Sequence, residues 1–222
     1  MTKQETLAEL QALGTAQNRK IYARHGVGET MYGVSYANLN KLKKRIKTDH
    51  HLALQLWESG NHDARVLACM IADPQQADAH LLERWVADLE NYVLCDAFSH
   101  LAAASPAGWE KAREWMPSSE EWRGRVGWTL LAILAGKDPS LDDDQLISCI
   151  KTVEEEIHQR PNRTRDAMLN AVIAIGLRSP EGESAALEAA RRIGSVEVDH
   201  GQTSCKTPEI REYIERVNKR KR

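Results

Sequence analysis

The chain has 222 residues, of which 42% are hydrophobic, 28% are charged and 5% are aromatic. This composition excludes a disordered or fibrous chain, and the length allows a sizeable core without a disulfide or a metal as a staple. The 30 Lys and Arg residues against 32 Asp and Glu residues give a net charge of −2. That balance excludes a wholly basic nucleic-acid binder and leaves room for a local basic face.

Apolar residues recur with a helical period along the whole chain, and strict alternation is almost absent, so the sequence predicts an all-α fold. The expected helices, in chain order, span residues 3–13, 15–25, 35–47, 50–59, 62–72, 75–88, 91–104, 106–115, 119–135, 142–158, 162–178, 181–193 and 208–219. No linker rich in Gly, Ser or Pro divides them, so we expect one domain over residues 1–222.

Five of the seven prolines follow an Asp, Ser or Thr that can cap a helix, as expected for a proline in the first helical position. These prolines, at positions 74, 106, 139, 180 and 208, are separated by 32, 33, 41 and 28 residues. The intervals accommodate about two short helices each, which is typical of an α-solenoid of HEAT-like helix pairs. Such a stack is expected to have one concave wall for a large extended ligand.

Charges of opposite sign are segregated along the chain. Acidic residues gather at 142–144 and 154–156, whereas the basic clusters comprise Lys41, Lys43, Lys44, Arg45 and Lys47 in one helix and Arg160, Arg163 and Arg165 at the start of another. Two interpretations stay open: a neutral chain with one positive wall, or solvated outer faces of unrelated helices.

The helix expected at 91–104 places Tyr92 and Asp96 one turn apart on the same face. A carboxylate beside an aromatic ring and flanked by apolar residues is either a hydrogen-bonded structural group or a poised anion. The helix expected at 119–135 places Arg125 three residues before Trp128. This pair suits a phosphate with a stacked ring, or an arginine packed flat on a half-buried indole.

Signals for targeting and for cofactors are scarce. The four cysteines form no CxxC pair and residues 1–10 lack an apolar centre, so we expect a cytoplasmic protein. No apolar stretch is long enough to span a membrane. His200 and Cys205 lie in the segment VDHGQTSCKTP, which we interpret as a polar loop, and nucleotide-binding and hydrolase patterns are absent. We therefore expect no metal and no organic cofactor.

Four segments in order carry a resemblance to a known family: MYGVSYANLNKLKKRIK, LALQLWESGNHDARVLACMIADP, WVADLENYVLCDAFS and EEWRGRVGWTLLAIL. Together they resemble the HEAT-like DNA alkylation repair family, the AlkD-type alkylpurine DNA glycosylases, from about Met31 to Ala135. The resemblance implies a monomer that acts on duplex DNA carrying alkylated bases.

The resemblance also implies roles for individual residues. Asp96, Tyr92 and Arg125 fall on the family's catalytic positions, where Asp96 stabilises positive charge on deoxyribose and Arg125 binds a phosphate near the lesion. A cationic N3- or N7-alkylated purine leaves without protonation, so an anion and π faces suffice. The DNA-binding set adds Trp128, Lys41, Lys43, Lys44, Lys47, Arg163, Arg165 and Asn170.

Two departures from the family pattern leave the function open. Tyr92 and Asn170 stand where the family usually has tryptophan, so two indole faces are weakened or missing. The leading hypothesis is a glycosylase that excises cationic N3- or N7-alkylated purines. The alternative is a non-catalytic relative that binds damaged, bent or branched DNA, and a protein-binding scaffold is the third possibility.

Overall fold

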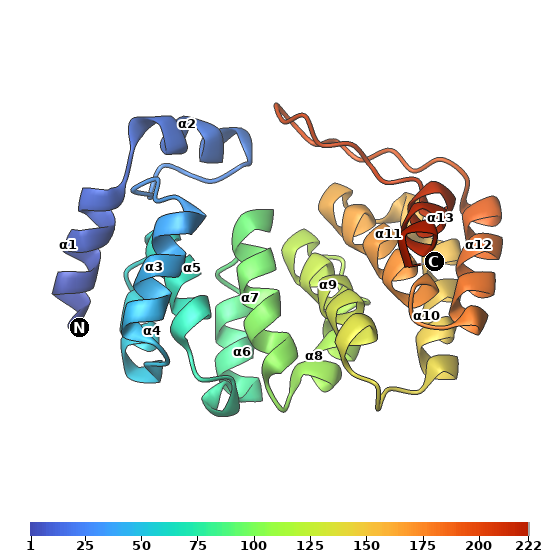
Figure 1. The fold of residues 1–222 in the computed structure, drawn as a ribbon, viewed down its shortest axis with the longest axis horizontal. Helices are drawn as coiled ribbons and strands as arrows, with labels where there is room; N and C mark the ends of the chain where they lie inside the picture. The colour runs from blue at the N-terminus through green and yellow to red at the C-terminus, as the bar shows by residue number, and fades with distance from the viewer. Residues whose placement is uncertain (222) are drawn as a thin grey trace. The chain divides into compact units, whose positions relative to one another are not determined.

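The computed structural model describes residues 1–221, and within that range it contains thirteen α-helices, two short 3-10 helices and no strand (Figure 1). The prediction of an all-α fold is confirmed. The helices form two compact units, one from Met1 to Ala107 with Gly201–Thr203, and one from Gly108 to His200 and from Ser204 onward. The expectation of a single domain over residues 1–222 stays a prediction, and its last residue lies outside the described range.

Unit 1 is built around helix α5, which contacts α3, α4 and α7. Its helices are α1 (Lys3–Leu13), α2 (Ala16–Arg24), α3 (Tyr36–Ile46), α4 (His50–Trp57), α5 (His62–Ile71), the 3-10 helix η1 (Pro74–Gln76), α6 (Ala79–Val86) and α7 (Tyr92–Ala104). Helix α5 is buried on nearly all sides because apolar residues fill most of its positions. By contrast, α2 contains no buried residue.

An aromatic stack joins α4 to α6 in the core of unit 1. The rings of Trp57 and Trp85 lie parallel with centroids 4.0 Å apart, and the ring of Phe98 in α7 lies 6.3 Å from that of Trp57. The guanidinium of Arg65 in α5 lies 5.2 Å from the centroid of the Trp57 ring and also binds the carboxylate of Asp88. Stacked aromatic contacts and a cation over an indole each stabilise such a core beyond simple burial.

Unit 2 is organised around the long helices α9 and α11, which pack along each other. Its helices are α8 (Gly108–Trp115), α9 (Glu121–Lys137), α10 (Asp143–Glu156), the 3-10 helix η2 (Ile157–Gln159), α11 (Asn162–Gly176), α12 (Pro180–Ile193) and α13 (Ile210–Lys221). Its core contains Trp128, Leu131, Met168 and Val172 among a continuous cluster of buried apolar side chains.

The prediction that five prolines stand at the first position of a helix is confirmed for two of them and wrong for three. Ser179 caps α12, with its hydroxyl accepting from the Gly182 amide at 3.2 Å, and Asp73 caps η1. Pro106 and Pro139 lie in turns before α8 and α10, and Pro208 lies in irregular backbone before α13. The helix expected at 75–88 is likewise split, because the Asp78 carboxylate accepts from the Leu81 amide at 2.7 Å and starts α6 anew.

Glycine at position 127 allows α9 to approach α8 closely. A Cβ added at Gly127 would lie 2.4 Å from the backbone nitrogen of Met116 and 2.6 Å from the carbonyl carbon of Trp115. Backbone atoms cannot move aside as a flexible side chain does. We therefore expect Gly127→Ala to lower the free energy of unfolding by about 1 to 3 kcal/mol, measured by urea denaturation.

Gly136, on the same helix, provides the matched control. A Cβ there meets no atom within 4 Å. Gly136→Ala is expected to leave stability unchanged or to raise it, because alanine is the better helix former. Equal stability of the two variants would contradict the close approach at Gly127.

Candidate nucleic-acid interface

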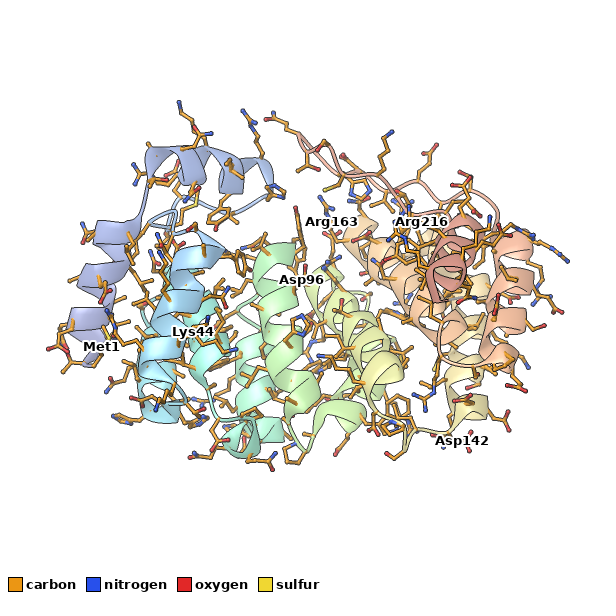
Figure 2. All side chains as sticks on the ribbon, viewed as in Figure 1. Met1, Lys44, Asp96, Asp142, Arg163 and Arg216 are labelled. Carbon is orange, nitrogen blue, oxygen red and sulfur yellow. The ribbon has the colours of Figure 1, made fainter. Side chains whose placement is uncertain are left out.

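The first basic cluster of the sequence, Lys41 to Lys47, lies on helix α3 and its C-terminal cap, as predicted. Ser35 caps the start of the helix, Leu39 and Leu42 face the core, and the four lysines of the cluster are exposed. Figure 2 labels Lys44 on this helix.

One member of this cluster is neutralised within unit 1. Arg45 forms an ion pair with Glu9 of α1. The four lysines of the cluster form no ion pair with a carboxylate of the described residues; they are Lys41, Lys43, Lys44 and Lys47. Their charges are therefore available to an external anion.

Tyr92 and Asp96 lie on α7 as the sequence predicted, with both side chains partly exposed. Asn91 caps the helix by accepting from the Leu94 amide at 3.0 Å, and Leu94, Cys95 and Phe98 anchor its other face in the core. Asp96 therefore stands at the surface of unit 1, one turn after Tyr92 (Figure 2).

Two residues that the sequence did not single out lie near Tyr92 and Asp96. The His25 ring, at the end of α2, hydrogen-bonds to the hydroxyl of Tyr92, with ring centroids 5.7 Å apart. Tyr36, the first residue of α3, is 43% exposed. Burial of its hydroxyl raises the pKa of Tyr36, with further contributions from Tyr22 and Asp96. Unit 1 thus gathers a carboxylate, two phenols and an imidazole, drawn from three helices.

A buried carboxylate holds the segment that leads into α3. Asp63 of α5 has no exposed surface, and it accepts hydrogen bonds from the backbone amides of Tyr32, Gly33 and Val34 at 2.6, 3.0 and 2.8 Å. Gly33 has φ +80°, which glycine adopts without strain. In the sequence Asp63 is visible only as part of the HDARVLA segment, because its three donors lie about thirty residues earlier.

Arg125 is not a free guanidinium at the surface of unit 2. Its side chain is 7% exposed, and its Nη1 forms an ion pair with Asp166 of α11 at 2.8 Å and donates to the Arg163 carbonyl at 3.2 Å. The phosphate-binding role that we expected for Arg125 would require this pair to open. In the structure Arg125 instead ties α9 to the first turns of α11.

Trp128 does not offer an indole face to a ligand, so the expectation of a DNA-contacting ring is wrong for this conformation. The residue is 1% exposed, and its indole N–H donates to the Met116 carbonyl at 3.2 Å. The spacing of the two residues also allowed Arg125 to pack flat on Trp128. In the structure Arg125 binds Asp166 and the Arg163 carbonyl, whereas Trp128 binds the Met116 carbonyl. The ring belongs to the continuous cluster of buried apolar side chains in the core of unit 2.

The predicted residues Arg163, Arg165 and Asn170 all lie on α11. Arg163 donates its backbone amide to Glu121 of α9 at 2.7 Å, and its guanidinium lies 3.5 Å from His200. Arg165 is partly buried and forms no ion pair with a described carboxylate. Asn170 is exposed, and its side-chain amide donates to the Asp166 carbonyl at 2.9 Å.

The predicted site residues thus fall into two groups. Unit 1 brings Tyr92 and Asp96 together with His25 and Tyr36, and unit 2 brings Arg125, Arg163 and Asn170 together around Asp166. The convergence of Asp96 and Arg125 on one concave wall stays a prediction. Within residues 1–221, no helix has the length and apolar character that crossing a membrane requires.

Comparison with known proteins identifies relatives over nearly the whole chain. The DNA alkylation repair enzyme family matches residues 6–216. An uncharacterized protein of Listeria innocua is 28% identical over 223 aligned residues, covering 96% of this chain and 95% of the relative. An uncharacterized protein of Listeria monocytogenes is 27% identical with the same coverage.

A solved structure has the same fold. It is similar with a TM-score of 0.92 and 28% sequence identity, covering all of this chain and 96% of the other. That protein is described as a member of a new family related to the HEAT-like repeat DNA glycosylases, with affinity for branched DNA structures. The prediction of HEAT-like helix pairs is therefore confirmed.

Proposed function

The chain belongs to the DNA alkylation repair enzyme family, and from this premise we propose that it binds branched DNA without excising bases. The proposal rests on the commitment of Arg125 and Trp128 to internal contacts, together with four exposed and unneutralised lysines on α3 and its C-terminal cap. A basic surface supplies affinity for phosphates, whereas excision of a base also requires groups arranged around the reacting sugar.

Two further observations favour binding over excision. Tyr92 and Asn170 stand at positions where a glycosylase of this family usually has tryptophan, and Tyr92 is already engaged with His25. The similar solved protein has affinity for branched DNA. A branch point concentrates phosphates of several strands, which suits a protein whose exposed basic residues are clustered while its total charge is close to neutral.

The direct test is binding of the full chain to a four-way junction, a three-way junction and a linear duplex of matched composition. Fluorescence anisotropy over a range of salt concentrations gives the dissociation constants. We expect tighter binding to the branched forms and weaker binding to all forms as salt rises. Equal affinity for branched and linear DNA would contradict the proposal.

The lysines of α3 are expected to bind phosphates of the DNA backbone. Replacing Lys41 and Lys44 by glutamine should weaken DNA binding roughly tenfold near physiological salt and reduce the salt slope by about 0.9 for each phosphate that is no longer neutralised. The matched control replaces Lys137 and Lys151, which are exposed in unit 2, and removes the same charge. If the control variant loses as much affinity as the α3 variant, the effect is one of net charge and not of a site.

A second candidate function is excision of cationic N3- or N7-alkylated purines. It is favoured by the partly exposed carboxylate of Asp96 with Tyr92 one turn away and Tyr36 nearby. An anion flanked by phenol rings can stabilise an oxocarbenium-like sugar while the charged purine departs.

If this second function holds, Asp96→Asn should reduce release of 3-methyladenine and 7-methylguanine from methylated duplex DNA by at least about a hundredfold, because the substitution removes the anion but keeps the shape. Chromatography of the released bases measures the effect. Tight binding of methylated DNA with no release by the unaltered protein would exclude excision and leave the binding function standing.

A further inference from the structure

Helix α2 has an inner face and an outer face that are chemically different. Asn18, Tyr22 and His25 lie on the inner face at i, i+4 and i+7, and all three are partly buried. The Tyr22 hydroxyl donates to the Val34 carbonyl at 2.6 Å, and its ring meets His62 edge-on at 5.9 Å. His25 contacts Tyr92. These contacts fix how the helix is rotated about its axis.

The outer face of α2 is consequently fixed as well. It consists of Gln17, Lys20, Ile21 and Arg24, at i, i+3, i+4 and i+7, and all four side chains are exposed. Lys20 and Arg24 form no ion pair with a carboxylate of the described residues. Both cations are therefore available to an external anion, although the helix was not part of the predicted basic surface.

Ile21 is unusual among the apolar residues of the chain. In the part that the structure describes, the exposed large hydrophobic side chains are Met1, Ile21 and Tyr36. Ile21 is thus an exposed aliphatic group between two uncommitted cations, on a nine-residue helix with no buried residue of its own. The outer face of α2 therefore makes no contribution to the buried core of unit 1.

We propose that the outer face of α2 binds the branch point of DNA, with Lys20 and Arg24 on backbone phosphates and Ile21 against an unstacked base. This inference rests on the proposed function. The charge complementarity selects a polyanion, since two cations one turn apart match successive phosphates. The apolar residue favours a branch, because base faces are exposed where stacking is interrupted, and isoleucine is one of the apolar side chains that insert between base steps.

Two contacts place α2 beside elements of unit 1 that carry other predicted DNA-binding residues. His25, the C-terminal cap of α2, contacts Tyr92 on the partly exposed side of α7 where Asp96 also lies. Arg19, on the flank of α2, extends its guanidinium to the Tyr32 carbonyl at 3.5 Å, beside the segment that leads into the lysine-bearing helix α3. These two contacts connect α2 to α7 and to the segment that leads into α3, while Lys20, Ile21 and Arg24 stay exposed.

The test uses the full chain with three variants. Lys20→Gln with Arg24→Gln should weaken binding to both linear and branched DNA and reduce the salt slope by about 1.8 for two phosphate contacts. Ile21→Ser should leave affinity for linear duplex unchanged and lower the preference for a four-way junction. Ile21→Leu, which keeps the aliphatic group, should retain that preference.

A second readout reports on the base itself. A four-way junction with 2-aminopurine at the branch point should gain fluorescence when the unaltered protein binds, and should gain less with Ile21→Ser. The Lys137→Gln and Lys151→Gln double variant again serves as the charge control, and thermal unfolding confirms that each variant is folded.

The possible failures are distinguishable. If the unaltered protein binds no DNA, both the proposed function and this inference are overturned. If the protein prefers branched DNA and the α2 variants behave like the unaltered chain, the proposed function stands and this inference is overturned. Loss of affinity in the charge control equal to that of the Lys20 and Arg24 variant would also overturn it.

Discussion

Arg125→Ala is expected to lower the free energy of unfolding by about 3 to 5 kcal/mol, because it leaves the carboxylate of Asp166 without its cation in a largely buried position. The two side chains are 7% and 15% exposed, and the Nη1 to Oδ2 distance is 2.8 Å. The same guanidinium also donates to the Arg163 carbonyl, so the substitution removes a second link between α9 and the start of α11. Chemical denaturation measures the effect.

The double variant Arg125→Met with Asp166→Leu separates a structural role from DNA binding. Replacing both charges by apolar groups of similar size is expected to recover most of the lost stability. If Arg125 is mainly structural, this variant binds DNA as the unaltered chain does. If Arg125 opens its ion pair to bind a phosphate, as the family resemblance implies, the double variant is stable and still loses DNA affinity.

Asp63→Ala is expected to cost at least about 3 kcal/mol, because it leaves three backbone amides without their acceptor. Hydrogen bonds to an ionised carboxylate are among the strongest in proteins, and this carboxylate has no exposed surface. The amides of Tyr32, Gly33 and Val34 should lose their protection from hydrogen exchange, whereas those of α9 should keep it.

Asp142→Ala provides the control for Asp63. The Asp142 carboxylate also accepts from two backbone amides, those of Asp144 and Gln145, but the residue is an exposed helix cap. Its replacement is expected to cost only about 1 kcal/mol. A similar loss of unfolding free energy in both variants would show that the burial of Asp63 does not strengthen the contribution of its hydrogen bonds to stability.

The sequence was most informative where local rules decide structure. The basic helix at 35–47 was predicted because Leu39, Leu42 and Ile46 recur at helical spacing, and it forms at Tyr36–Ile46. Tyr92 and Asp96 were expected on one face of a helix, and they lie one turn apart on α7. Helix starts were less predictable, since proline also fits the non-helical segment before a helix, as it does before α8, α10 and α13.

Other residues show their importance only in the folded chain. Lys20, Ile21 and Arg24 have the spacing of one helical face, but that face is defined only when Tyr22 and His25 are known to point inward. Asp63 lies in a segment that indicates the family, while its role depends on amides in a different part of unit 1.

The all-α fold, the family and the exposed lysines of α3 could be predicted from the sequence alone, because periodicity and exposure follow from neighbours within one or two turns. Whether each charged side chain is available to a ligand could not be predicted from the sequence, because this depends on tertiary packing. Arg125 is neutralised by Asp166, 41 residues later in the chain, and Trp128 is covered by other helices of its unit. Lys20 and Arg24 meet no such carboxylate among the described residues. Ion pairing depends on distances of a few ångströms between distant segments, and only packing sets those distances.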